Sequence, residues 1–133
     1  MTTPEQGLKT AQTALRIGLG AAAFLAGLDK YFNLLTDWSM YLAPWMSAHL
    51  PLAPETFLKL VGLVEMAAGL LVLSRFTRLG AYVVAAWLVA IAIQLATTGM
   101  FFDLAVRDAE KALAAFALAK LTEWRLARPA VAA

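Results

Sequence analysis

The sequence has no cysteine and only one histidine, His49, among its 133 residues. The absence of cysteine excludes disulfides, thiol redox chemistry, cysteine-ligated zinc and iron–sulfur clusters. A single histidine excludes a haem held by two histidines of one chain, and we predict no haem and no metal site. Charged residues are also scarce, at 15% of the chain, against about 25% in an average globular protein. There is no run of lysine or arginine of the kind that suits nucleic acid, so no nucleic-acid partner is expected.

Hydrophobic residues are abundant instead, at 62% of the chain, where a soluble domain has about 45–50%. A helix that crosses a membrane needs about 20 mostly apolar residues, and three segments meet this requirement. A fourth meets it only if it includes Arg107, Asp108, Glu110 and Lys111. We therefore predict an all-α membrane protein with one integral membrane domain over residues 1–133, folded as a four-transmembrane-helix bundle. The expected spans are roughly residues 11–33, 57–74, 78–98 and 103–122.

Basic residues are found in alternate connections. The N-terminal segment, the link with Arg75 and Arg78, and the C-terminal segment are basic, whereas the other two connections are balanced or acidic. By the positive-inside rule, both termini then lie in the cytoplasm, which requires an even number of spans. Residues 1–28 also have features of a signal peptide. Because Asp29, Lys30 and further apolar residues follow directly, we interpret this segment as a retained span.

Residues 33–56 form the one long connection between the expected spans. Its apolar residues recur at helical spacing, which predicts an interfacial amphipathic segment between helices 1 and 2, with Leu34, Leu35, Trp38, Tyr41, Leu42 and Trp45 on one side. Thr36 or Asp37 can cap this short helix, and Pro44 breaks or restarts it. The segment is either an anchor in the membrane interface or a lid over a lipid-like ligand. We expect His49 to be an interfacial polar residue.

Ionisable residues inside membrane spans are costly and point to function. At about 1.5 Å of rise per residue, five polar residues reach a layer about 21–27 Å above the cytoplasmic basic residues: Lys30, Gln94, Arg107, Asp108 and Lys111. Glu65 lies lower, about 15 Å above them and near the midplane. Asp103 lies four residues before Arg107 and can pair with it. We therefore expect a polar layer in the outer half of the bundle.

Two interpretations of this layer compete. The charges either neutralise one another and hold the helices together, or they line a pocket open to the outer leaflet, where Arg107 or Lys30 donates to a carbonyl or an anionic head group. A proton or ion path is a third alternative. The candidate ligand-binding residues are Lys30, Glu65, Gln94, Asp103, Arg107 and Asp108. The candidate ring-packing residues are Trp38, Tyr41, Phe101 and Phe102, and no catalytic residue is assigned.

Four short motifs in order along the chain resemble the DoxX-like family of small bacterial inner-membrane proteins. They are Arg16-Ile-Gly-Leu-Gly, Phe24-Leu-Ala-Gly-Leu-Asp-Lys30, Glu65 with Gly69, and Phe102-Asp103-Leu-Ala-Val-Arg107-Asp108. The resemblance extends from about residue 10 to about residue 122. It implies four helices in the bacterial inner (plasma) membrane and a membrane subunit related to that of a thiosulfate:quinone oxidoreductase. The family pattern places its Gly-x-x-Lys motif on Gly27 and Lys30, its acid on Glu65, and its Arg-Asp pair on Arg107 and Asp108.

The resulting hypothesis is a membrane subunit that binds quinone or lipid and serves a redox complex. Any catalysis belongs to a quinone-linked oxidoreductase of which this chain is a component, and quinone is the one cofactor expected. The alternative is a structural or assembly protein that anchors a partner, with the basic tail from Arg125 to Ala133 as a docking element. A small-solute transporter is a weaker alternative. The expected partners are the lipid bilayer, a protein of a membrane complex, and a second copy of the chain.

Overall fold

The computed structural model describes residues 3–127, and helices make up most of them. Four helices are long: α1 (Pro4–Asp29), α3 (Pro54–Leu73), α4 (Thr77–Thr97) and α5 (Phe102–Ala127). Between α1 and α3 lie two short helices, the 3-10 helix η1 (Trp38–Tyr41) and α2 (Pro44–His49). No strand occurs within residues 3–127. The prediction of an all-α chain is confirmed.

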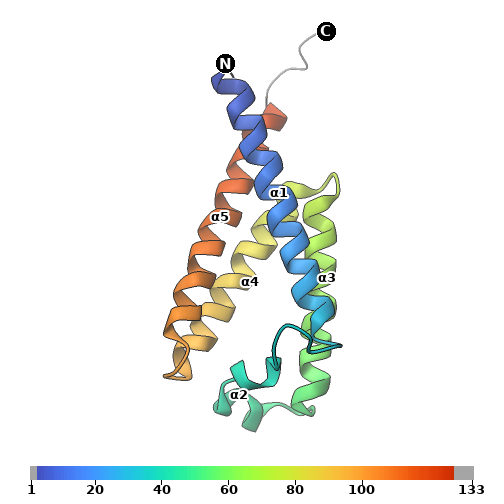
Figure 1. Cartoon of the computed structure of the whole chain (residues 1–133), viewed down its shortest axis with the longest axis vertical. Coiled ribbons are helices and arrows are strands. Elements are labelled where there is room, and N and C mark those ends of the chain that lie inside the picture. Colours follow the sequence, from blue (N-terminus) through green and yellow to red (C-terminus); the bar gives the residue numbers. More distant parts are fainter. Residues whose placement is uncertain (1–2, 128–133) are drawn as a thin grey trace.

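The long helices pack as two antiparallel pairs (Figure 1). The most extensive contacts join α1 to α3 and α4 to α5, and smaller ones join α3 to α4 and α1 to α5. The described ends of the chain lie at one end of the molecule, toward which the 74–76 link also points. The opposite end holds η1, α2 and the turn between α4 and α5. The basic segments, which we predicted to be cytoplasmic, therefore share one end of the molecule.

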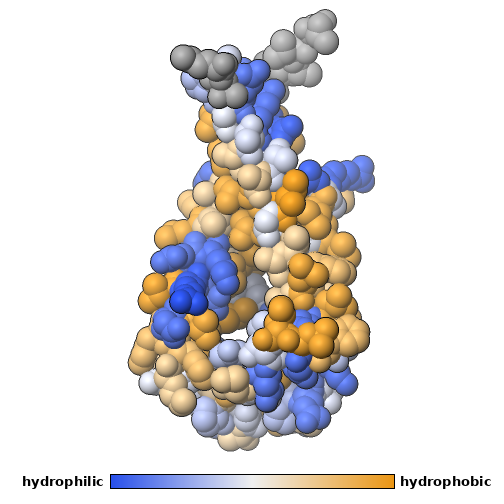
Figure 2. All heavy atoms as spheres, viewed as in Figure 1, coloured by the Kyte–Doolittle hydropathy of each residue, from blue (hydrophilic) through white to orange (hydrophobic). Residues whose placement is uncertain are grey.

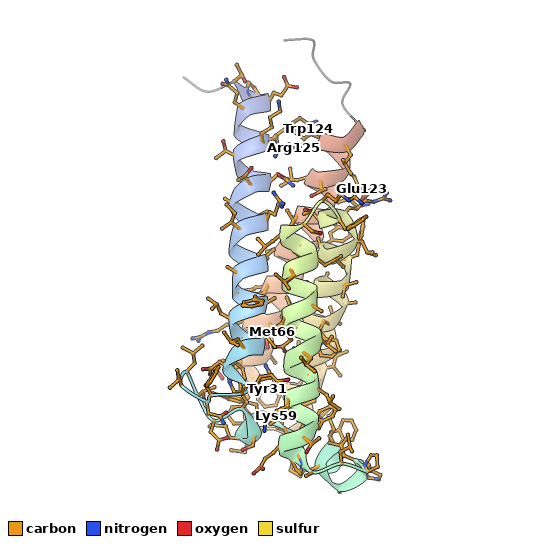
Figure 3. The ribbon with its side chains drawn as sticks, turned by 90° about the vertical axis from the view of Figure 1, so that its right-hand side faces the viewer. Tyr31, Lys59, Met66, Glu123, Trp124 and Arg125 are labelled. Carbon is orange, nitrogen blue, oxygen red and sulfur yellow. The ribbon has the colours of Figure 1, made fainter. Side chains whose placement is uncertain are left out.

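Glycines bring α1 and α3 into close contact. A Cβ atom added at Gly62 would lie 2.5 Å from the carbonyl oxygen of Gly27, and one added at Gly69 would lie 2.6 Å from that of Gly20. Each helix thus presents two glycines seven residues apart. Because the helices are antiparallel, Gly20 lies against Gly69 and Gly27 against Gly62. Small residues allow such close backbone approach between helices in a membrane. Figure 3 shows the C-terminal half of α1 side by side with α3.

The apolar core lies toward the end that holds the termini. It consists of small and medium side chains from three helices, of which the fully buried ones are Val72, Ala81, Ala115, Leu118 and Ala119. Beside it, the guanidinium of Arg16 donates to the last carbonyls of α3, at 3.2 Å from both Val72 O and Ser74 O, and also to Leu73 O. A cation is favourable there because the C-terminus of a helix carries partial negative charge.

Three helices, α1, α3 and α4, are long and apolar enough to cross a membrane. Large aliphatic side chains on them, such as Ile17, Leu63 and Ile93, are more than half exposed. An exposed apolar surface of this extent suits contact with lipid, so the chain is a membrane protein. The fourth long helix, α5, is not among the three candidates, because it carries several charged residues in its first half.

The first helix differs from the expected span of residues 11–33. It begins at Pro4, where Thr3 and Gln6 form a capping box, and it ends at Asp29. The carboxylate of Asp29 accepts the backbone N–H groups of Leu34 and Leu35, both at 2.9 Å. These hydrogen bonds draw the chain out of the helix, and no local sequence pattern predicts them.

The connection at residues 33–56 is not one amphipathic helix but two short ones. Asp37 caps η1 by accepting the Ser39 N–H at 3.1 Å, as predicted. Pro44 restarts the chain as the first residue of α2. Leu34 and Leu35, which we expected on the helical stripe, precede both helices and are strongly exposed, Leu34 at 84%. His49 is exposed and its Nδ1 lies 2.6 Å from Trp45 O.

Candidate functional site

A cavity of about 460 Å³ lies between the two helix pairs. Most of its lining is aliphatic, from α1, α3 and α4, and includes Leu19, Val61 and Leu88. The η1–α2 segment contributes Trp38 and Met46. Figure 2 shows the molecule hollowed in the half that holds η1 and α2. Sites for small molecules usually have volumes of about 300–1,000 Å³ and apolar walls with a few polar groups, so this cavity is the candidate site.

Lys30 and Glu65 form a buried ion pair that lines the cavity. Lys30 Nζ lies 2.7 Å from Glu65 Oε2, and the two side chains are only 6% and 9% exposed. Trp87 of α4 donates its Nε1–H to the other carboxylate oxygen at 3.3 Å. The carboxylate therefore joins α1, α3 and α4. A pair this well buried is unfavourable to break, since removing one partner leaves an uncompensated charge.

Trp38 of η1 packs on the same lysine. Its ring centroid lies 3.9 Å from Lys30 Nζ, a cation–π contact, and its Nε1–H donates to Asp29 Oδ2 at 2.9 Å. Asp29 therefore orients Trp38, and Trp38 covers Lys30. Among the described residues Lys30 Nζ has one hydrogen-bond acceptor, Glu65. An ammonium group has three N–H donors, so it retains the capacity to donate to a further oxygen in the cavity.

Gln94 fastens the η1–α2 segment to α4. Its side-chain amide donates to Tyr41 O at 3.1 Å, and its Oε1 accepts the Ala43 N–H. The ring of Tyr41 meets the edge of Phe101 at a centroid distance of 4.9 Å. On the other side, Tyr31 O–H donates to Lys59 O at 3.0 Å (Figure 3). Gln94 thus holds the middle of the η1–α2 segment over one end of the cavity, and Tyr31 ties the chain before η1 to α3.

The α5 side of the cavity carries a second, looser ion pair. Asp108 Oδ1 and Lys111 Nζ are 3.5 Å apart, and the lysine side chain is 59% exposed. Both residues line the cavity. The ionisable lining residues are thus two lysines and two acids, which balance formally. A neutral ligand with hydrogen-bonding oxygens fits such a site better than a charged one.

The model of the DoxX family matches residues 11–98. The chain belongs to the DoxX family. The match includes Gly27, Lys30 and Glu65 but ends before α5, so the Arg107-Asp108 part of the predicted resemblance lies outside it. No curated protein and no solved structure matches the chain.

In this DoxX protein the four long helices and the η1–α2 segment form the cavity. Six of the ten predicted site residues line it. They are Lys30, Trp38, Tyr41, Glu65, Gln94 and Asp108. Phe101 lies behind Tyr41. Phe102, Asp103 and Arg107 are exposed and do not line it. The expected pairing of Asp103 with Arg107 is absent from the ion pairs of residues 3–127.

Lys30 and Glu65 are in contact although their backbone positions were expected at different heights. Their heights, estimated from backbone rise, differed by about 6 Å, yet the charged groups are in contact. The estimate compared backbone positions, whereas the long lysine side chain reaches back along the helix to the carboxylate. Arg107 was placed in the same layer, but α5 turns it outward. Height along a helix does not determine which way a residue faces.

Two residues of the DoxX site were missed at the sequence level, Trp87 and Asp29. Trp87 lies in the middle of an apolar span, where an indole N–H requires a partner, but only the structure identifies that partner as Glu65. Asp29 precedes Lys30 directly, but its role depends on the loop conformation. Within residues 3–127 no group of three or more histidine or acidic residues is placed to hold a metal.

Proposed function

We propose that this DoxX membrane protein binds a quinone in the cavity between its two helix pairs and serves a membrane redox complex. The observation that carries the proposal is the Lys30–Glu65 pair, which sits among apolar side chains with Trp38 against the lysine and Trp87 against the carboxylate. Buried ionisable groups in a membrane protein point to function by default.

The residues present fit a quinone head group. A quinone is neutral and flat, and its carbonyl oxygens accept hydrogen bonds. Lys30 Nζ has donor capacity beyond Glu65, and the rings of Trp38, Tyr41 and Trp87 line the same cavity. Aromatic rings favour offset or edge contacts with one another and with flat ligands. The aliphatic lining from α1, α3 and α4 suits the apolar remainder of such a molecule.

The chain's own residues hold the ligand and set its electrostatic surroundings. Lys30 donates to a carbonyl oxygen, Glu65 orients the lysine, and Gln94 and Asp29 hold the covering segment. A bound quinone supplies the capacity to carry electrons and protons. The electron donor is then a separate protein, and the chain acts as a component of a quinone-linked oxidoreductase.

The proposal includes the placement of the chain in the bacterial inner membrane. Four spans with both termini in the cytoplasm agree with the positive-inside rule, since Lys9, Arg16, Arg75 and Arg78 all lie toward the end that holds the termini. The η1–α2 segment and the cavity then belong to the outer half of the membrane. In this arrangement α5 is the fourth span, and its charged half lies at the level of the cavity.

Quenching of tryptophan fluorescence by a short-tailed quinone tests the proposal. Trp38 and Trp87 line the cavity, whereas Trp45 does not and donates instead to Thr97 Oγ1 at 2.8 Å. We expect saturable quenching that is lost when Trp38 and Trp87 are replaced by phenylalanine and kept in Trp45→Phe. Quenching that rises linearly without saturation, or that depends equally on Trp45, contradicts a site in the cavity.

The structural alternative makes a different prediction for the same titration. If the ion pair only holds helices together, as in an assembly protein that anchors a partner, quinone quenches all exposed tryptophans alike. The already satisfied pairing of Lys30 with Glu65 is the observation that favours this alternative.

The transporter hypothesis has no feature of the described residues in its favour. The basic tail was predicted as a docking element for a partner. Its first residue, Arg125, donates to Gln12 Oε1 at 2.7 Å, and residues 128–133 lie outside the described residues.

A further inference from the structure

One side of α5 carries a charged stripe that nothing in the described chain covers. Asp103, Arg107 and Glu110 are exposed and form no ion pair with any other residue from 3 to 127. Lys111 flanks them and is also mostly exposed. The stripe continues in alternating steps of four and three residues through Ala117, which is exposed, and through Ala114 and Leu121, which are half-buried. Figure 2 shows a hydrophilic patch beside the hollow, surrounded by apolar surface.

The position of the stripe conflicts with contact with lipid. α5 packs antiparallel along α4, a candidate membrane span. Lys111 lies nine residues beyond Phe102, about 14 Å along the axis, which is close to the level of the middle of α4. Exposed ionised side chains at this depth are costly in hydrocarbon, and they are usually buried against protein or in a water-filled cavity. The stripe therefore requires a protein cover.

The charges on the stripe complement themselves. The order along the stripe is acid, base, acid, with Arg107 one helical turn from Asp103 on one side and from Glu110 on the other. Two copies inserted with the same topology are related by a two-fold axis along the membrane normal, so they present the same residues at the same heights. The long, forked Arg107 side chain can then reach an acid one turn above or below on the facing helix.

We propose that α5 pairs in parallel with α5 of a second copy of this chain along the stripe Asp103, Arg107, Glu110, Ala114, Ala117 and Leu121. Steps of four and three residues define a seam of the coiled-coil type. Ala114 and Ala117 have small side chains that allow the two helices to approach. Such an interface is isologous, because the same surface is used by both copies. The reciprocal Arg107–Glu110 pairs fix its register.

Cysteine cross-linking in isolated membranes tests this dimer cleanly, because the chain has no cysteine of its own. We expect iodine oxidation to link Ala114→Cys and Ala117→Cys chains into a dimer of twice 14.3 kDa. Leu113→Cys and Phe116→Cys are matched controls, each one residue away and about 100° around the helix, and both are exposed. They should stay monomeric. Equal cross-linking at all four positions, none at any, or links to a different protein overturns the proposal.

A charge exchange separates specific pairing from simple proximity. In the Ala117→Cys background, Arg107→Glu and Glu110→Arg should each reduce the cross-linked dimer, because each places like charges opposite one another. The double variant Arg107→Glu/Glu110→Arg restores the complementary pairs and should recover cross-linking. If the double variant stays as low as the single ones, the proposed pairing is wrong. The readout involves no ligand, so it is independent of the quinone proposal.

Discussion

Lys30 Nζ reaches Glu65 Oε2 across the point where Gly27 of α1 meets Gly62 of α3. Lys30 lies three residues after Gly27, and Glu65 three residues after Gly62, so in antiparallel helices the two lie on opposite sides of the crossing. A Cβ atom at Gly62 would come within 3.3 Å of Lys30 Cβ, and one at Gly27 within 3.0 Å of Glu65 Cβ. The glycine contact therefore places the ion pair at the cavity.

Removing one partner of this ion pair should destabilise the protein strongly. Lys30→Ala or Glu65→Ala leaves a buried charge without compensation, which costs about 3–5 kcal/mol. The double variant Lys30→Met/Glu65→Leu replaces the pair with apolar groups of similar size, and such replacements are often neutral or stabilising. Thermal unfolding in detergent measures both effects. Lys9→Ala, at an exposed position of α1, is the control, and single variants as stable as this control would contradict a buried pair.

Alanine at the glycine crossing should separate the first helix pair. In Gly62→Ala the new methyl group meets the Gly27 carbonyl oxygen, a backbone atom that cannot move aside. Overpacking of this kind costs about 1–3 kcal/mol. Gly18→Ala is the matched control, since a Cβ atom there has no neighbour within 4 Å, and it should be neutral or stabilising by up to about 1 kcal/mol. Equal stability of the two variants in thermal unfolding would show that α1 and α3 lie further apart at Gly27 and Gly62 than the structure has them.

Loss of the Asp29 carboxylate should free the segment that covers the cavity. Asp29→Ala leaves the N–H groups of Leu34, Leu35 and Trp38 without their acceptor. Hydrogen bonds to a charged group contribute about 1.5–3 kcal/mol each, so the segment should open when these three part-buried bonds are lost. Hydrogen exchange followed by mass spectrometry should show faster exchange at residues 34–42. Asp37→Ala, which removes only the cap of η1, should affect fewer amides; equal effects would argue against an anchoring role for Asp29.

Membrane orientation can be tested with single cysteines, because the natural chain has none. Ser39 in η1 and Arg75 in the 74–76 link are both exposed and lie toward opposite ends of the molecule. We expect a membrane-impermeant thiol reagent to label Ser39→Cys in intact spheroplasts, and to label Arg75→Cys only after lysis. The reverse pattern would invert the orientation inferred from the positive-inside rule.

Helix content and membrane character could be predicted from the sequence, because they depend on local composition. Long apolar segments predict membrane helices whatever their neighbours are. The end of α1 at Asp29 could not be predicted in this way, because it depends on hydrogen bonds to residues beyond the helix. The weakness of the fourth span was visible in its charges, and α5 is not among the helices apolar enough to cross a membrane.

The candidate site could be predicted only in part, because local composition identifies polar residues but not the directions in which they face. Polar residues in apolar spans are easy to find, and Lys30, Glu65 and Gln94 do meet at one cavity. The direction in which each residue faces depends on the rotation of each helix against its neighbours. The rotation of α5 leaves Arg107 outside the cavity. The role of Trp87 likewise follows from the packing of α3 on α4, which no local pattern specifies.

Quinone binding is tested most directly by mass spectrometry of small molecules extracted from gently purified protein, beside a mock purification from the same membranes. We predict quinone enriched to nearly one molecule per chain in the wild-type protein and in Arg107→Ala. It should be lost in Lys30→Met/Glu65→Leu, which remains folded. Quinone at the level of the mock sample in the wild-type protein, or retained at wild-type stoichiometry in that double variant, would contradict the account.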